Sequence, residues 1–194
     1  MKLQRVLQYA QFLLKETVET GDIVVDATAG NGYDTTYLAQ LVGEGGHVFA
    51  FDVQQQAIEA TNKRLTEAGM ADRVSAILDG HENVAQYVQK PISAAIFNLG
   101  YLPGSEHQII TKPNTTLQAI ESLLNLLKVG GMIVLVVYYG HEGGKEERDQ
   151  VIEYVSSLPQ KKVHVLRYEF INQKNDPPFV IALEKVAALQ DIVE

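Results

Sequence analysis

The stretch Asp26-Ala27-Thr28-Ala29-Gly30-Asn31-Gly32-Tyr33-Asp34-Thr35 decides the fold of this chain. It begins inside a short apolar run, Ile23–Thr28, that is typical of a buried strand, and it enters a helical pattern at Tyr33–Val42. Its two glycines let the backbone pass close to a ligand, because glycine has no Cβ atom. The free N–H groups at the start of the helix favour a carboxylate or a phosphate. A glycine pair alone also suits a plain tight turn, but the strand context and the leading aspartate favour a binding loop.

Strand and helix patterns alternate along the rest of the chain. Further apolar strand patterns are found at His47–Asp52, Val74–Leu78, Ser93–Asn98 and Met132–Tyr139. Helical patterns are found at residues 3–18, at Gln54–Ala68, at His81–Gln89, in a segment that Asn114 caps and Gly130-Gly131 ends, and at Lys145–Ser156. The last two strand patterns, Lys162–Asn172 and Phe179–Glu184, have no helix between them and should pair as a hairpin. We therefore predict an α/β fold with a mostly parallel, doubly wound, seven-stranded sheet and one antiparallel strand in the C-terminal hairpin.

Length and composition limit the functions that the chain can have. With 194 residues, no repeats and no linker, we expect one domain over residues 1–194, with an N-terminal helix in 1–20 and the core in 21–194. The net charge is −8 and both halves are acidic, which argues against binding nucleic acid through the overall field. The absence of cysteine excludes disulfides and a cysteine nucleophile, and it fits a cytoplasmic protein. The longest apolar run is too short to span a bilayer.

The residue that ends the second predicted strand is Asp52, twenty residues after Gly32. A carboxylate at this place can accept both hydroxyls of a ribose, although an aspartate there can also cap the following helix. A glycine loop followed by such an acid suits either NAD or S-adenosylmethionine. The dinucleotide motif requires a third glycine where this chain has Thr35, and Asp26 can meet the ammonium group of S-adenosylmethionine. The loop therefore favours S-adenosylmethionine, with an NAD-dependent oxidoreductase as the alternative.

The segment after the third predicted strand, Asp79–Asn83, is rich in polar side chains. These side chains can frame an adenine edge, or they can simply begin a helix. The pair His81-Glu82 does not open a zinc motif of the H-E-x-x-H type, because the fifth residue is Ala85. We therefore expect no metal.

The segments after the fourth and fifth strands carry candidates for the reaction itself. Asn98 offers one acceptor and two donors, and Tyr101 offers a flat face for a base. Their pattern resembles the Asn/Asp-Pro-Pro-Tyr/Phe loop of methyltransferases that modify nitrogen on nucleobases, with both prolines replaced. The glycine-rich segment after the fifth strand contains His141, which can act as a base near neutral pH, although such a histidine more often orients a substrate or is exposed. Amides in Asn172–Pro178 are expected on the same side.

Six segments together resemble one known family, the small class I methyltransferases labelled rRNA methylases. Within it, the chain is similar to the enzymes that complete 5-methylaminomethyl-2-thiouridine at the wobble position of tRNA in Gram-positive bacteria. The segments are residues 26–35, 51–54, 79–83, 97–104, 136–141 and 170–179. Glu106-His107 departs from the Asp-Lys expected there. The resemblance implies a Rossmann-like fold, S-adenosylmethionine as cofactor and the tRNA anticodon stem-loop as partner, and it allows a homodimer.

The motifs and the resemblance together assign the site residues. Cofactor contacts are expected from Asp26, Gly30, Asn31, Gly32, Asp34, Thr35, Asp52, Gln54, Asp79, His81, Glu82 and Asn98. Substrate contacts are expected from Tyr101, Pro103, Tyr139, His141, Asn172 and Gln173. The candidates for catalysis are His141, Tyr139 and Asn98.

The expected reaction is methyl transfer to the amine of 5-aminomethyl-2-thiouridine, which must be neutral when it attacks. Three alternatives stay open: a methyltransferase for rRNA or a small-molecule amine, which the acidic charge mildly favours, the oxidoreductase named above, and a non-catalytic RNA-binding module. The locally basic stretch at residues 161–174 can meet RNA phosphates, or it can be an ordinary solvated strand.

Overall fold

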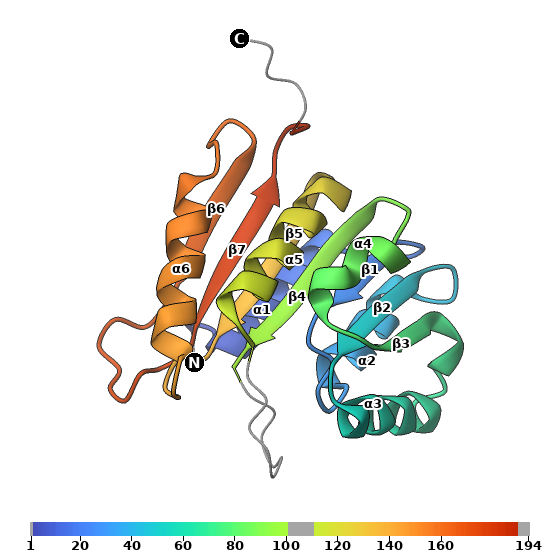
Figure 1. Cartoon of the computed structure of the whole chain (residues 1–194). Coiled ribbons are helices and arrows are strands. Elements are labelled where there is room, and N and C mark those ends of the chain that lie inside the picture. Colours follow the sequence, from blue (N-terminus) through green and yellow to red (C-terminus); the bar gives the residue numbers. More distant parts are fainter. Residues whose placement is uncertain (1, 101–110, 190–194) are drawn as a thin grey trace.

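The computed structural model of the chain describes residues 2–100 and 111–189 (Figure 1). Seven strands form one sheet in the order β3-β2-β1-β4-β5-β7-β6. Five of them run parallel: β1 (Ile23–Asp26), β2 (His47–Asp52), β3 (Val74–Leu78), β4 (Ile92–Leu99) and β5 (Leu127–Val137). Strand β7 (Phe179–Lys185) lies antiparallel between β5 and β6 (Val163–Tyr168). The predicted mixed sheet with its antiparallel hairpin strand is therefore confirmed.

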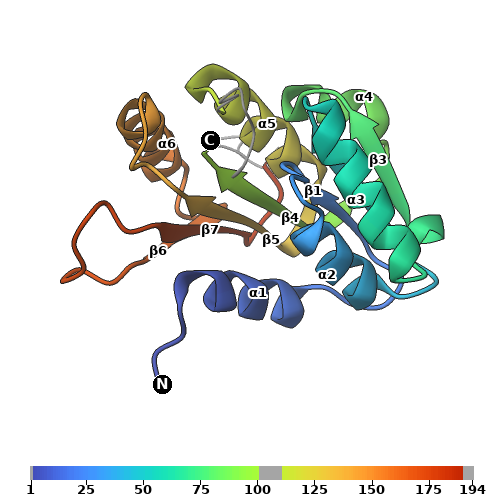
Figure 2. The ribbon, with the colours of Figure 1, turned by 90° about the horizontal axis from the view of Figure 1, so that it is seen from below.

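Helices cover both faces of the sheet, as Figure 2 shows for α1 and α2 on one side and α5 and α6 on the other. Helices α1 (Val6–Thr17), α2 (Tyr33–Val42) and α3 (Gln55–Glu67) share one hydrophobic core with the sheet. Helices α4 (Val84–Tyr87), α5 (Pro113–Leu126) and α6 (Gly144–Ser157) pack on the opposite face. Two short 3₁₀ turns, η1 (Ala71–Arg73) and η2 (His81–Asn83), flank β3. Within the described ranges, none of the helices has the length and apolarity to cross a membrane.

Strand β4 shows how the sheet positions polar groups. It is buried along nearly its whole length, as expected for a central strand with helices on both faces. Ala94 and Ile96 enter the core under α1 and α2, whereas Ala95 and Phe97 enter the core under α5. Because side chains alternate along a strand, Asn98 follows Ala94 and Ile96 toward the side of α2.

Several predicted boundaries are wrong. The helix expected at His81–Gln89 is the 3₁₀ turn η2 followed by the single helical turn of α4. Helix α5 is capped by Lys112 with Pro113 in its first turn, not by Asn114, because proline already has a helical φ and lacks the N–H that a cap would satisfy. The strand expected over Lys162–Asn172 ends at Tyr168.

The glycine pair Gly130-Gly131 does not end a helix. Helix α5 stops at Leu126, and both glycines lie inside β5, which begins at Leu127. The pairing of β4 with β5 changes register between Ile92 and Ala94, so the extra residues of β5 form a bulge. A Cβ atom at Gly131 would lie 2.7 Å from the carbonyl oxygen of Ser93, so the close approach of β4 explains this glycine.

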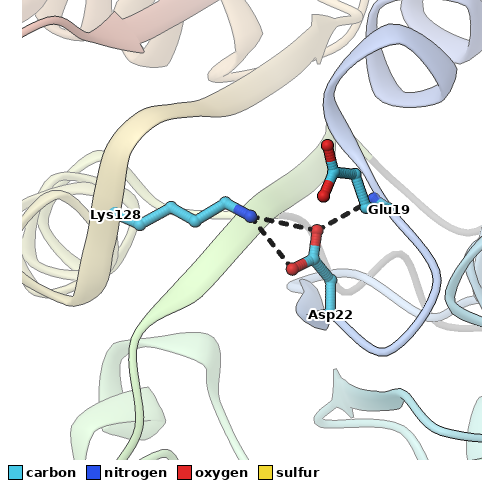
Figure 3. Close-up of polar contacts among 3 residues, drawn as sticks. All are labelled: Glu19, Asp22 and Lys128. Carbon is cyan, nitrogen blue, oxygen red and sulfur yellow. Dashed lines mark hydrogen bonds and ion pairs between the residues drawn. The ribbon is translucent and has the colours of Figure 1, made fainter.

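An ion pair fastens the segment between α1 and β1 to the start of β5 (Figure 3). Lys128 Nζ lies 2.9 and 3.2 Å from the two carboxylate oxygens of Asp22, and the N–H of Glu19 donates to the same carboxylate at 2.9 Å. Partial burial opposes ionisation of Asp22, but the hydrogen bonds from Glu19 and Lys128 outweigh it and lower the pKa of that carboxyl. The contact lies at the amino end of β1, away from the carboxyl ends where ligands bind in such sheets.

Candidate active site

A cavity of about 850 Å³ opens at the carboxyl ends of the parallel strands, next to β1 and β4. In this sheet the strand order reverses at β1, which is where open α/β sheets bind ligands. Nine of the expected cofactor residues line the cavity: Gly30, Asn31, Asp34, Asp52, Gln54, Asp79, His81, Glu82 and Asn98. Three others, Asp26, Gly32 and Thr35, are absent from its lining.

The glycine loop after β1 folds back on itself. The N–H of Gly32 donates to the carbonyl of Ala29 at 2.8 Å, and Gly32 has a positive φ of 77° at the start of α2. A Cβ atom at this position would also lie 2.8 Å from the backbone of Thr61 in α3. Gly32 therefore permits the turn and the close packing of α3, and the surface of the cavity is left to Gly30 and Asn31.

Asp26 does not face the cavity, contrary to the expectation that its carboxylate meets an ammonium group. Its side chain is fully buried. The carboxylate accepts a hydrogen bond from the hydroxyl of Thr35 at 2.6 Å and another from the N–H of Thr28 at 3.1 Å. Burial, assisted by repulsion from Asp34, raises the pKa of Asp26 to about 7. Asp26 and Thr35 thus hold the loop from beneath, and the acid exposed to the cavity on this side is Asp34.

Asp52 is the last residue of β2 and lines the cavity. One carboxylate oxygen accepts the N–H of Gly30 and the other accepts the N–H of Gln54, each at 2.9 Å. Asp52 therefore fixes the loop after β1 and the start of α3 together, while its side chain still lines the cavity. Helix α3 has Gln54 as its N-cap residue, so Asp52 is not the cap itself.

The end of the cavity near β3 is built from Asp79, Gly80, His81 and Glu82. Asp79 accepts hydrogen bonds from the hydroxyl of Tyr87 at 2.8 Å, from the amide of Asn83 at 2.9 Å and from the N–H of Gly80 at 2.7 Å. These bonds, that from Tyr87 first, lower the pKa of Asp79.

His81 offers an acceptor at the same end. Its Nδ1 lies 3.0 Å from the carbonyl oxygen of Ala27, which can only accept, so Nδ1 carries the proton. Burial lowers the pKa of His81, which favours the neutral ring and leaves Nε2 as an acceptor. Nε2 is buried without a hydrogen-bond partner among the described residues. An orphaned acceptor of this kind fits a bound ligand that carries a donor, such as the amino group of an adenine.

The opposite end of the cavity combines residues from four segments. The amide of Asn98 donates to Asp34 at 2.8 Å, and its backbone N–H donates to the hydroxyl of Thr28 at 2.7 Å. Tyr138 lines the same end, and burial, with the negative charge of Asp34, raises the pKa of its phenol. Leu7 and Gln11 of α1 complete this wall.

The charges of the lining residues select between the two expected cofactors. Four acids line the cavity, Asp34, Asp52, Asp79 and Glu82, and Lys112 is the one cation among the described lining residues. S-adenosylmethionine carries a sulfonium and an ammonium group, whereas a dinucleotide carries an anionic pyrophosphate. An acidic cavity attracts the first and repels the second. The N–H of Gly30, which a phosphate would need, is also taken by Asp52.

Four of the expected substrate residues, Tyr139, His141, Asn172 and Gln173, do not line the cavity. The other two, Tyr101 and Pro103, lie outside the described residues. Tyr139 packs against Phe179 with ring centroids 5.7 Å apart, under the guanidinium of Arg148. His141 lies beside Gly144 and near Gly100, because Cβ atoms built at these glycines would approach its Cε1 atom to 2.7 and 3.7 Å. Asn172 and Gln173 are exposed in the segment between β6 and β7.

Sequence reasoning assigned no role to several lining residues. Four of them lie inside the quoted segments, namely Thr28, Val53, Gly80 and Tyr138, and five lie outside these segments, namely Leu7, Gln11, Thr111, Lys112 and Thr115. The alternation of side chains along β5 could have predicted that Tyr138 lines the cavity. Val136 enters the core under α1 and Val137 the core under α5, so Tyr138 continues toward the side of Asp34 and Tyr139 away from it.

The basic stretch at residues 161–174 offers few cations for phosphates. Lys162 is buried and donates to the carbonyl of Ala188 at 2.6 Å. Arg167 pairs with Glu169 at 2.6 Å and covers the ring of Phe179. Arg167 thus lies in an ordinary strand, whereas Lys162 is buried just before β6 and is not solvated as that interpretation expected; Lys161 and Lys174 are exposed.

The fold and the acidic cavity at the ends of β1 to β4 define a class I S-adenosylmethionine-dependent methyltransferase. A solved O-methyltransferase from Thermotoga maritima, 19% identical with a TM-score of 0.65, shares the fold. More specifically, the chain belongs to the family described as Putative rRNA methylase, whose model matches residues 48–184. The enzyme is therefore a methyltransferase, and the oxidoreductase alternative is wrong.

Close relatives extend this comparison over nearly the whole chain. A crystal structure from Clostridium thermocellum, described as an rRNA methylase, is 47% identical, covers 95% of this chain and all of its own, and has a TM-score of 0.93. A methyltransferase from Streptococcus mutans, solved in complex with SAH, is 41% identical, covers 94% of this chain and 99% of its own, and has a TM-score of 0.87. The chloroplastic tRNA (mnm(5)s(2)U34)-methyltransferase of Arabidopsis thaliana is 35% identical over 94% of this chain and 70% of its own length.

Proposed function

We propose that this enzyme methylates the amine of 5-aminomethyl-2-thiouridine at the wobble position of tRNA, with S-adenosylmethionine as the methyl donor. The observation that carries the proposal is the 35% identity, over 94% of the chain, to a tRNA (mnm(5)s(2)U34)-methyltransferase. We also propose that residues 1–194 act as one methyltransferase domain.

The two ends of the cavity suit two different ligands, the cofactor and the substrate amine. Asp52, Asp79 and His81 would hold the nucleoside part of the cofactor, since they combine fixed carboxylates with a buried acceptor. Asp34, at the other end, would face the substrate amine. When bound, S-adenosylmethionine supplies an electrophilic methyl group. The chain must then position an amine and exclude water, and such positioning lowers a barrier by several kcal/mol, up to roughly 7–11 in well-oriented cases.

The amine must lose a proton before it attacks. The acidic cavity favours the alkylammonium ion, so a group that contacts the amine must take its proton, and a carboxylate in the same cavity can accept it. Asp34 lines the cavity and is held by Asn98, whereas His141 is not among its lining residues. We therefore favour Asp34 over His141 as the acceptor. The oxygen of the Asn98 side chain makes no hydrogen bond with the described residues, so it can accept one from the amine.

Nucleoside mass spectrometry tests the proposal. The protein would be incubated with S-adenosylmethionine and tRNA that carries 5-aminomethyl-2-thiouridine. We expect that nucleoside to gain one methyl group, and Asp52→Ala serves as the control with impaired cofactor binding. Methyl transfer to rRNA or to no RNA, by a protein that binds SAH, would contradict the assignment of substrate.

A second candidate is methyl transfer to rRNA or to a small-molecule amine. The net charge of −8 and the contacts that Lys162 and Arg167 make within the chain favour a small acceptor, because they reduce the number of cations available to phosphates. Parallel assays with total RNA and with metabolite extracts separate these substrates.

A further inference from the structure

Glu147, in the first turn of α6, is a buried acid outside the cavity. Its side chain is 3% exposed, and its two carboxylate oxygens accept hydrogen bonds from the hydroxyls of Thr111 at 2.6 Å and Thr116 at 2.7 Å. Thr116 belongs to α5 and is fully buried. Burying a carboxylate is costly unless it is hydrogen-bonded, so the two hydroxyls explain how the fold tolerates Glu147. They do not explain why an acid is present there.

Thr111 extends this contact to the wall of the cavity. Its hydroxyl donates to Glu147 and accepts the N–H of Gly100 at 3.1 Å, while its own N–H donates to the carbonyl of Gly100 at 3.1 Å. Thr111 and Gly100 both line the cavity, whereas Glu147 and Thr116 are absent from its lining. The carboxylate is thus two hydrogen bonds away from the backbone at the end of β4.

Gly100 connects these hydrogen bonds to the end of the cavity that Asp34, Asn98 and Tyr138 line, where the substrate amine is proposed to bind. This end is called the acceptor wall below. Its φ of 149° is one that favours glycine, and a Cβ atom there would lie 3.2 Å from Cβ of Tyr138. Tyr138 also lines the cavity, and Asn98 lies two residues before Gly100. A change in the position of Thr111 would therefore shift Gly100 and, with it, both Tyr138 and Asn98.

Building on the proposed function, we propose that Glu147 is a positioning residue for methyl transfer, which acts through Thr111 to fix Gly100 and hence the acceptor wall of the cavity. Glu147 lies one helical turn after Gly143, so it also joins the segment that follows β5 to the end of β4. The cofactor residues Asp52, Asp79 and His81 come from other strands and make no hydrogen bond to these groups. The negative charge of Glu147 acts to raise the pKa of His81, so its removal in Glu147→Gln keeps that ring neutral, as a hydrogen-bond acceptor must be. Substitution of Glu147 should therefore lower the rate of methyl transfer to the substrate amine and leave cofactor affinity unchanged.

Valine substitutions provide a matched pair of variants. Thr111→Val and Thr116→Val each remove one hydroxyl from Glu147 at nearly constant volume. Only Thr111→Val also removes the hydrogen bond from the N–H of Gly100, while the backbone bond from residue 111 to the Gly100 carbonyl remains. At saturating S-adenosylmethionine, we expect kcat on tRNA to fall about tenfold or more in Thr111→Val and Glu147→Gln, and to change less than about twofold in Thr116→Val. Thr111→Ser, which keeps the hydroxyl, should recover most of the rate. SAH affinity measured by calorimetry should stay within about twofold of wild type in Glu147→Gln and Thr116→Val.

Amide hydrogen exchange at Gly100, followed by NMR on the protein without substrate, gives a second readout. Exchange should be faster in Thr111→Val and Glu147→Gln than in wild type, and unchanged in Thr116→Val. Equal loss of kcat in both valine variants, or unchanged exchange in Glu147→Gln, would overturn the positioning role. If wild type transfers no methyl to tRNA, the proposed function fails, but the exchange comparison still decides the role of Glu147.

Discussion

At the scale of single residues, the acids of the site differ in environment although they lie within one loop and two strand ends. Asp26 is fully buried, Asp34 lines the cavity, and Asp52 joins two backbone N–H groups. These environments separate an acid that supports the loop from acids that can meet ligands. Two predictions depend on this difference.

Asp34 and His141 compete for the role of proton acceptor. At saturating S-adenosylmethionine, Asp34→Asn should lower kcat by about 10²-fold or more, the usual loss when a general base is removed. His141→Ala should lower kcat by less than about tenfold, because its side chain is not part of the cavity lining. Single-turnover rates across pH 6 to 9 provide the measurement. A larger loss in His141→Ala than in Asp34→Asn would reverse the assignment.

The pKa of Asp26 predicts a pH dependence of stability. In the unfolded chain this carboxyl has the ordinary aspartate pKa of 3.8, whereas burial raises its pKa in the folded protein to about 7. The folded state therefore keeps a proton that the unfolded state releases, and stability falls as pH rises from about 4 to 7. The buried carboxyl should cost roughly 2–3 kcal/mol more at pH 8 than at pH 5.

Asp26→Asn removes this titration. We expect the free energy of unfolding of the variant, relative to wild type, to rise by that amount between pH 5 and pH 8 in urea titrations without cofactor. Asp72→Asn, at an exposed position in η1, is the control and should show no such rise. Parallel pH profiles of wild type and Asp26→Asn would show that Asp26 is ionised in the folded protein at pH 5.

At the scale of elements, the junction of β4 and β5 depends on a residue without a side chain. A Cβ atom at Gly131 would lie 2.7 Å from the carbonyl oxygen of Ser93 and 2.9 Å from the side chain of Leu127. Since a backbone atom cannot move alone, Gly131→Ala should lower the free energy of unfolding by about 1–3 kcal/mol. Gly45→Ala has only an ordinary contact of 3.7 Å and should stay within about 0.5 kcal/mol. Urea denaturation of both variants tests this, and equal stabilities would contradict the close approach.

At the scale of the whole molecule, cofactor binding and folding are linked. A ligand at 100 times its Kd stabilises the folded state by about 2.7 kcal/mol, which for a chain of this size raises Tm by about 5–10 °C. We expect this shift with SAH and expect none with NAD, because the cavity carries four acids. Asp52→Ala should lose most of the SAH shift. Differential scanning fluorimetry is sufficient, and a comparable shift with NAD would refute the charge argument.

Much of this architecture was predictable from local patterns. The run from Asp26 to Thr35 placed a strand, a turn and a helix correctly, and the missing helix before Phe179 predicted the antiparallel strand. Boundaries failed where a proline or a bulge competed with a propensity rule, as at Asn114 and Gly130. Such competition is decided by neighbours that are distant in sequence, here Ser93 for Gly131.

The sequence by itself determined the class of fold, predicted the site at the strand ends and favoured S-adenosylmethionine over NAD, because periodicity, glycine spacing and side-chain chemistry are local properties. Only the tertiary structure decided which side chains face the cavity. Asp26 is buried while Asp34 lines the cavity, Tyr138 lines the cavity while Tyr139 packs on Phe179, and Glu147 reaches Gly100 through Thr111. The direction of a side chain depends on the twist of its strand and on the helix packed above it, and both are set by contacts between segments far apart in the chain.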